Sequence, residues 1–245
     1  MSDILTVMWK EWRELIWHGG SLRGGKLSLF VLLGVFGVFL PYQSGAGWVT
    51  SPASMFYWGW VPLMLVAGAI ADSFAGERER HTLETLLASR LPDRSILLGK
   101  VLAAVSYGWI LVMLMLLLSL ITVNLTVPGP GLLLFSRPFA IGAPILALLG
   151  GGFAGSAGVL VSLRATSVRQ AAQTLNVAIL LLILVPVLAG QALPDAAKAQ
   201  MGAWAASVGI VGLLAVVAGA FLLLDAGLLA AAMWRFRRAR LILEE

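Results

Sequence analysis

The stretch FAGERERHTLETLLASRLPDRSILLGK, residues 74–100, is the most charged part of a chain that is otherwise strongly apolar. A simple connector between two helices does not need such a density of charge. Between Asp72 and Ser95, nine charged side chains lie close together in the sequence: Asp72, Glu77, Arg78, Glu79, Arg80, Glu84, Arg90, Asp93 and Arg94. The density of charge raises the question of what this stretch contacts.

Leucine spacing within this stretch predicts a short helix. Leu83, Leu86 and Leu87 follow the i, i+3, i+4 pattern of one apolar stripe. Leu91-Pro92 ends that helix, because the residue before a proline avoids the α region. A rigid, ionic and partly apolar helix of this kind suits docking into a groove on a soluble protein. A solvated helix lying on lipid headgroups fits the same periodicity, so both interpretations stay open at this point.

The rest of the chain has the composition of a membrane protein. Of 245 residues, 60% are hydrophobic and 12% are charged, whereas soluble domains carry about 25% charged residues. This composition predicts one integral membrane domain over residues 1–245. The chain has no cysteine, which excludes disulfides, thiolate metal sites and thiol nucleophiles. Its two histidines, His18 and His81, lie far apart, so no metal site is predicted.

Six apolar segments are candidate membrane spans. They cover roughly residues 27–42, 55–72, 96–125, 139–162, 173–191 and 207–234. If the N-terminus is cytoplasmic, 15 of the 17 lysines and arginines fall inside, and only Arg137 and Lys198 fall outside. We therefore expect an all-α protein with six transmembrane helices in the cytoplasmic (inner) membrane and both termini in the cytoplasm. The net charge of +5 is then a topology signal, and no nucleic-acid partner is expected.

Residues 3–18 are expected to form an amphipathic interfacial helix that lies along the lipid bilayer. At 100° per residue, one arc is apolar and the other carries Glu11 and most other charged residues. Val7 and Trp17 break the pattern. The apolar arc holds Ile4, Leu5, Met8, Trp9, Trp12, Leu15 and Ile16. A simple anchor and a contact with a partner are both compatible with this helix.

Several polar and small residues lie within the expected spans. Asp225 lies in the sixth expected span, which makes it a possible intramembrane polar site, although contact with water or with Arg164 would also explain it. Lys100 is expected to reach the inner membrane interface with its ammonium group. GGGFAGSAG, residues 150–158, has the small-residue spacing of close helix packing. It is similar to the serine motif of rhomboid-like proteases, but neither histidine lies in a span to serve as base.

Residues 74–100 closely resemble the segment after the second span in type-2 ABC exporter permeases. The resemblance rests on Phe74, Ala75, Gly76, Glu77, Arg78, Glu79, Thr82, Leu83, Glu84, Leu86, Leu87, Ala88, Arg94, Ile96, Leu97, Gly99 and Lys100. His81 stands where the family usually has glycine, and the sequence Ser89-Arg90-Leu91-Pro92 shifts the proline. The resemblance covers about a tenth of the chain.

This resemblance implies a transport function. Such permeases pair as dimers of two copies or of two homologues, and each docks an ABC ATP-binding subunit that holds ATP and Mg²⁺. The segment 74–95 would contain the coupling helix, between spans two and three on the cytoplasmic side. Carried over to this chain, the ATPase-contacting or bracing residues are Glu77, Arg78, Glu79, Thr82, Leu83, Glu84 and Leu87.

The chain itself is not expected to be an enzyme or to hold a cofactor. A phosphate loop needs serine or threonine after Gly-Lys, but Gly99-Lys100 is followed by Val101. The leading hypothesis is therefore a transmembrane permease subunit that moves its substrate with energy from a separate ATPase. A stand-alone ion-coupled carrier or channel that relies on Asp225 is the alternative. A membrane enzyme is disfavoured, because no catalytic acid, base or nucleophile pairs with another among the spans.

Overall fold

The computed structural model describes residues 2–17, 25–51, 54–82, 90–129 and 131–236, and these residues form helices and their connections without any strand. The helices are α1 (Ser2–Trp17), α2 (Gly25–Gly34), the π-helical η1 (Val35–Phe39), α3 (Leu40–Ser44), α4 (Ala46–Thr50), α5 (Met55–Glu79), α7 (Asp93–Thr126), α8 (Arg137–Ser162), α9 (Val168–Ala192) and α10 (Asp195–Arg235). The all-α prediction is confirmed for this part of the chain.

Five of these helices are long and apolar enough to cross a membrane, namely α5, α7, α8, α9 and α10. The first expected span, residues 27–42, falls on the run from α2 through η1 to α3. Its apolar part, Leu29–Ser44, is shorter than the other five. Within the π-helical turn, the Gly37 carbonyl accepts a hydrogen bond of 2.9 Å from Thr122 Oγ1 of α7. The count of six spans stays a prediction.

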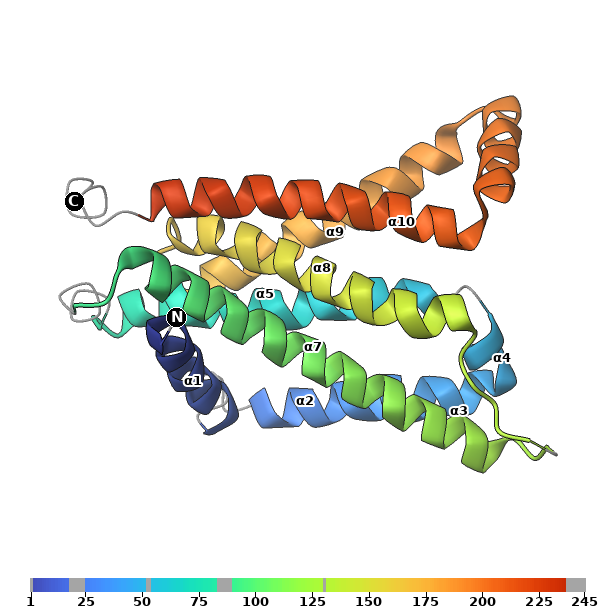
Figure 1. The fold of residues 1–245 in the computed structure, drawn as a ribbon, viewed down its shortest axis with the longest axis horizontal. Coiled ribbons are helices and arrows are strands. Elements are labelled where there is room, and N and C mark those ends of the chain that lie inside the picture. Colours follow the sequence, from blue (N-terminus) through green and yellow to red (C-terminus); the bar gives the residue numbers. More distant parts are fainter. Residues whose placement is uncertain (1, 18–24, 52–53, 83–89, 130, 237–245) are drawn as a thin grey trace.

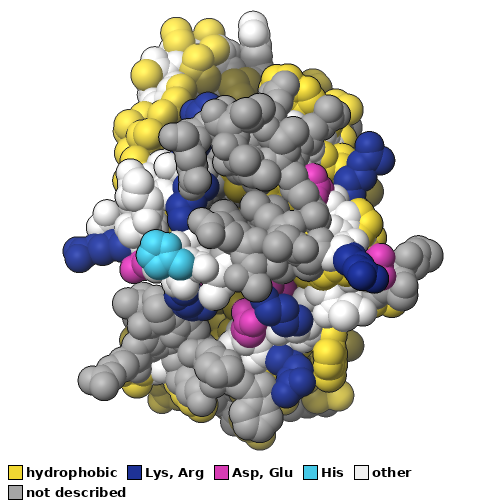
Figure 2. All heavy atoms as spheres, turned by 90° about the vertical axis from the view of Figure 1, so that its left-hand side faces the viewer, with side chains coloured by type: hydrophobic (Ala, Val, Ile, Leu, Met, Phe, Trp, Pro, Cys, Tyr) yellow, Lys and Arg dark blue, Asp and Glu magenta, His cyan; other side chains and the backbone are white. Residues whose placement is uncertain are grey.

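The helix ends divide between two sides of the bundle (Figure 1). The C-terminal ends of α5, α8 and α10 and the N-terminal ends of α7 and α9 lie on the left, beside α1. We call this side the charged end. Figure 2 views it face-on and shows lysine, arginine, aspartate and glutamate side chains gathered there. The expected cytoplasmic loops after residues 79 and 162 therefore share one side. This agrees with the distribution of lysine and arginine, which assigned both loops to the cytoplasm.

The core has two apolar clusters along the bundle. Near the charged end, α5 packs against α8, α9 and α7 around Ile70 and Phe74. Toward the other end, Trp58 and Met115 are fully buried in the second cluster. By contrast, α10 packs chiefly against α8, and its most apolar stretch has no buried residue in the single chain. Most of the surface of α10 is therefore available to lipid or to another protein.

Gly209 divides α10 into two parts. Its φ of +71° and ψ of 170° are not helical, and the chain changes direction there (Figure 1). Glycine is almost alone in tolerating this region, since it has no Cβ. The part after Gly209 matches the expected span 207–234.

Candidate functional site

The charged motif begins inside a membrane helix rather than after it. We expected the second span to end near residue 72, but α5 continues to Glu79, with Phe74 and Ala75 fully buried. The chain then turns at His81, two residues after the end of α5, where a φ of +55° lies in the left-handed region. Glycine adopts that region most easily, which explains the glycine usual at this position in the family that residues 74–100 resemble. The charged side chains before His81 are thus carried rigidly by a span.

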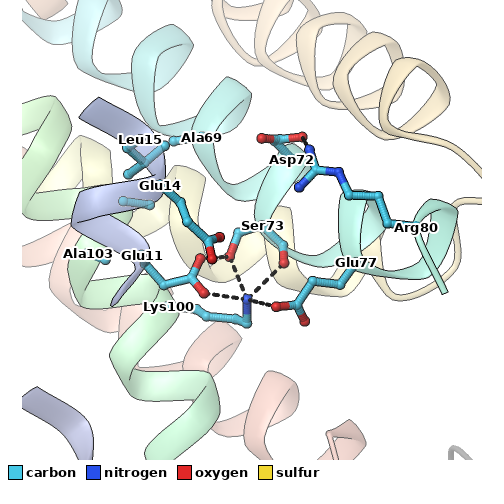
Figure 3. Close-up of a pocket in the computed structure, with 11 residues that line it drawn as sticks. Glu11, Glu14, Leu15, Ala69, Asp72, Ser73, Glu77, Arg80, Lys100 and Ala103 are labelled. Carbon is cyan, nitrogen blue, oxygen red and sulfur yellow. Dashed lines mark hydrogen bonds and ion pairs between the residues drawn. The ribbon is translucent and has the colours of Figure 1, made fainter. Parts of the chain in front are cut away.

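A lysine ammonium group is buried where three helices meet (Figure 3). Lys100 Nζ of α7 lies 2.8 Å from Glu11 Oε1 of α1 and 2.9 Å from Glu77 Oε1 of α5. It also donates to the Ser73 carbonyl at 2.9 Å and lies 3.2 Å from Ser73 Oγ. Only 1% of the Lys100 side chain is exposed. The expectation that Lys100 reaches the interface was therefore wrong, because its counter-ions lie inside the protein.

We call Glu11, Ser73, Glu77 and Lys100 the buried charge cluster. Two carboxylates and one ammonium leave an excess negative charge, and Lys10 reduces it from the rim. Lys10 Nζ lies 3.2 Å from Glu77 Oε1 and 3.4 Å from Glu11 Oε1. Burial alone would raise the pKa of the Glu11 carboxyl, but Lys100 and then Lys10 outweigh it and hold that pKa below its ordinary value. Glu11 is therefore ionised at neutral pH.

The buried charge cluster holds α1 against α7, and the backbones of the two helices approach each other closely beside it. Gly99 lets the two helices meet, since a Cβ there would lie 2.6 Å from Val7 Cβ. Trp12 Nε1 also donates a hydrogen bond of 2.9 Å to Ser106 Oγ. Val7 and Glu11 are both 4% exposed. The sequence pattern treated Val7 as a break and Glu11 as solvent-facing, but these two residues form the face that packs on the bundle.

The apolar residues of α1 partly face outward. Leu5, Trp9 and Ile16 are more than half exposed in the single chain. An exposed apolar arc beside the charged end fits the expected interfacial helix, whose apolar face would enter the headgroup region. The bilayer would thus hold one face of α1 while the buried charge cluster holds another.

Motif residues after Glu77 tie α5 to the connection between α8 and α9. Arg78 donates from Nη1 to the Ala165 carbonyl at 3.0 Å and from Nη2 to the Leu163 carbonyl at 2.9 Å. We call this contact the Arg78 clamp. Glu79 Oε2 accepts a hydrogen bond of 3.1 Å from the Val168 backbone N–H. The C-terminal end of α5 therefore holds the connection between α8 and α9.

These contacts locate four of the seven residues expected to contact or brace an ATPase. Glu77 points into the buried charge cluster, Arg78 and Glu79 hold the α8–α9 connection, and Thr82 donates from its backbone to the Glu77 carbonyl at 2.8 Å. The remaining three, Leu83, Glu84 and Leu87, lie outside the described residues. Whether any of the seven contacts an ATPase stays a prediction.

The sequence analysis did not predict the ion pair between Glu11 and Lys100. One signal for it was present, since a glycine followed by a lysine at the start of an apolar span allows both a close approach and a buried cation. The partner of that lysine, 89 positions away in the sequence, could not be identified from spacing.

Asp225 occupies a niche made by a glycine of α8. A Cβ at Gly152 would lie 2.7 Å from Asp225 Oδ2, so the carboxylate fills the space that a side chain would take. Asp225 Oδ1 is buried and has no hydrogen-bond partner within the described part of the chain. An ion pair with Arg164, the simpler explanation, is also not seen there. The possible polar site at Asp225 stays a prediction.

Within the described ranges, no group of three or more His, Asp or Glu residues could hold a metal ion.

Comparison with known proteins supports a transport family. A search of the curated proteins found no significant match. The family model described as ABC-2 family transporter protein matches residues 61–208. This range runs from α5 to the kink of α10 and includes both loops at the charged end, well over half of the chain. The chain therefore belongs to the ABC-2 family of transporter proteins.

Proposed function

We propose that this chain is the transmembrane permease subunit of an ATP-driven exporter. A separate ABC subunit would bind ATP and Mg²⁺, and a second permease copy or a homologue would complete the dimer. The observation that carries the proposal, beside the family match, is the interlocked charged end. Four helices and one loop meet there through polar contacts, all of them buried or partly buried except the exposed hydrogen bond between Glu79 and Val168.

The contacts give a path by which a movement at the coupling segment would reach the spans. Residues 83–89 connect α5 to α7, and both helices enter the buried charge cluster, through Glu77 and Lys100. Glu77 thus links the segment to α1, and the Arg78 clamp links it to α8 and α9. A push on the segment by an ATPase would displace these helices together, since packed interiors transmit strain rather than absorb it.

The proposed orientation puts the charged end in the cytoplasm, with Leu29–Ser44 as a short first span. Its 16 helical residues would extend about 24 Å, slightly less than a typical hydrocarbon core. Because the natural chain has no cysteine, single cysteines report the topology directly. Thr50→Cys should react with a membrane-impermeant maleimide in intact cells, whereas Arg94→Cys should react only after lysis. The opposite pattern would reverse the orientation.

ATPase coupling is tested with the purified permease and its candidate ATP-binding subunit in nanodiscs. Co-purification and permease-dependent ATP turnover are the expected results. Glu84→Lys should reduce that turnover severalfold without preventing membrane insertion. Asp195→Lys is the matched control, because it makes the same charge reversal at an exposed site on the opposite side of the bundle. Equal loss in both variants, or no association with any ATPase, would contradict the proposal.

The stand-alone ion-coupled carrier remains a second candidate because of Asp225. One oxygen of this carboxylate is buried and has no hydrogen-bond partner among the described residues, and such a group can bind a proton or ion during transport. This candidate predicts transport in liposomes without ATP or an ATPase, abolished by Asp225→Asn. The exporter proposal predicts no transport in that preparation.

A further inference from the structure

A second polar cavity opens at the charged end, between α8, α9 and α10. Its volume is about 450 Å³. Arg164 and Arg235 line it together with Gln170 and Thr174, and Leu160 and Val161 supply an apolar wall. The buried charge cluster lies in a different cavity, so the two sites share no lining residue.

The polar lining of this cavity suits an anion. No carboxylate lines it, and neither arginine takes part in an ion pair within the described residues. Gln170 Oε1 already accepts from the Thr166 backbone N–H at 2.9 Å and from Thr166 Oγ1 at 2.8 Å. Among the residues that the structure describes, the NH₂ group of Gln170 donates no hydrogen bond. Two guanidinium groups and neutral donors without a nearby acid attract negative charge.

Both arginines are held in place by anchored neighbours. Arg164 lies between the two residues whose carbonyls the Arg78 clamp fixes. Arg235 precedes Phe236, which is 2% exposed and packs edge-on against Phe74 of α5 at 5.7 Å. The two cations are thus brought to one cavity by contacts that do not themselves depend on a ligand, which is what a preorganised binding site requires.

We propose that this cavity binds the phosphate of an anionic phospholipid from the leaflet at the charged end. A free phosphate would need only the arginines, whereas the apolar wall and the neighbouring exposed apolar surface of α9 and α10 also suit the acyl chains. Basic pockets between transmembrane helices on the cytoplasmic side are typical sites for anionic headgroups. The leaflet follows from the orientation proposed above, but the lipid contact itself does not depend on it.

Native mass spectrometry of the full chain, titrated with phosphatidylglycerol or phosphatidylcholine in detergent micelles, tests this proposal. The double variant Arg164→Gln, Arg235→Gln should bind phosphatidylglycerol about thirtyfold more weakly, since each basic residue near an anionic headgroup contributes roughly fivefold. The control Arg90→Gln, Arg94→Gln loses the same charge at two exposed residues of the same end outside the cavity. It should bind as the wild type does.

Three results would overturn the proposal. Phosphatidylcholine could bind as tightly as phosphatidylglycerol, the control variant could lose as much affinity as the cavity variant, or sn-glycerol 3-phosphate could displace the lipid at an equal concentration. The last result would assign the site to a soluble phosphate compound. If the double variant does not fold, Thr174→Phe fills the cavity and keeps both arginines, and it should weaken phosphatidylglycerol binding by tenfold or more. Unchanged binding would then refute the site.

Discussion

Replacing Lys100 with methionine would test how strongly buried charge holds the interfacial helix. Methionine keeps most of the length of the side chain but removes the ammonium group. Glu11 and Glu77, whose side chains are 5% and 9% exposed, would then keep only Lys10 nearby, at 3.2 Å or more. Removing one partner of a buried ion pair typically destabilises a protein by about 3–5 kcal/mol. We expect a loss of that size in the free energy of unfolding.

An ion pair at the surface of the same region supplies the control. Arg80 Nη2 lies 3.1 Å from Asp72 Oδ1, but half of the Arg80 side chain is exposed. Exposed pairs contribute about 0–1 kcal/mol, so Arg80→Gln should have little effect. The comparison separates burial from simple loss of a positive charge, because both variants remove one cation within the same cavity lining.

Two measurements on purified protein in detergent micelles would check this prediction. Equilibrium unfolding gives the free energy, and maleimide labelling of Val7→Cys, in a chain without native cysteine, reports whether α1 has left α7. Val7 is 4% exposed, so labelling should be slow in the Lys100 background and fast with Lys100→Met. Adding Glu11→Gln and Glu77→Gln to Lys100→Met should restore most of the stability, since no unpaired charge remains buried. A loss below 1 kcal/mol with Val7→Cys still protected would refute the reasoning.

Three further outcomes follow from the described contacts. Gly99→Ala should destabilise the chain by about 1–3 kcal/mol in the same unfolding assay, because its Cβ would overlap α1, whereas Gly68→Ala, with open space around it, should not. The pKa of the Glu11 carboxyl lies below its ordinary 4.5, so the ionised carboxylate contributes fully to the free energy of unfolding above that pH, and this contribution is lost as the pH falls further. In an acid titration from pH 7 to 3, wild type should therefore lose stability relative to Glu11→Gln. Gly209→Ala should lower the free energy of unfolding by about 1–3 kcal/mol through backbone strain, because an added Cβ there would have no atom within 4 Å. Gly190→Ala is the control, since its Cβ would also have open space around it. Equal stability of the two variants would contradict this.

Hydropathy predicted the long helices well but not where each one ends. The third expected span, 96–125, and the fourth, 139–162, agree with α7 and α8 to within three residues at each end. The second was too short at its C-terminal end, because the apolar run stops near Asp72 while backbone hydrogen bonding continues to Glu79. Charged residues are compatible with helix, so a fall in hydropathy marks the membrane boundary rather than the helix end.

The site was predictable only in part. The motif singled out Glu77, Arg78 and Glu79, but most of their side-chain contacts run to residues 67 to 89 positions away. Such pairings depend on tertiary packing, which one sequence does not reveal. For the same reason Lys100 was expected at the interface. A long apolar stem with a terminal cation fits either environment, and only the position of Glu11 decides between them.

The buried charge cluster also constrains the order in which the chain can be assembled during synthesis. Its members emerge from the ribosome as residue 11, then 73 and 77, and last of all 100. Until α7 enters the bilayer, the two carboxylates have no deeply buried counter-ion, and α1 lacks the neighbour that fixes it. A nascent chain stalled before that helix should therefore keep both carboxylates without the ammonium group that pairs with them in the finished fold.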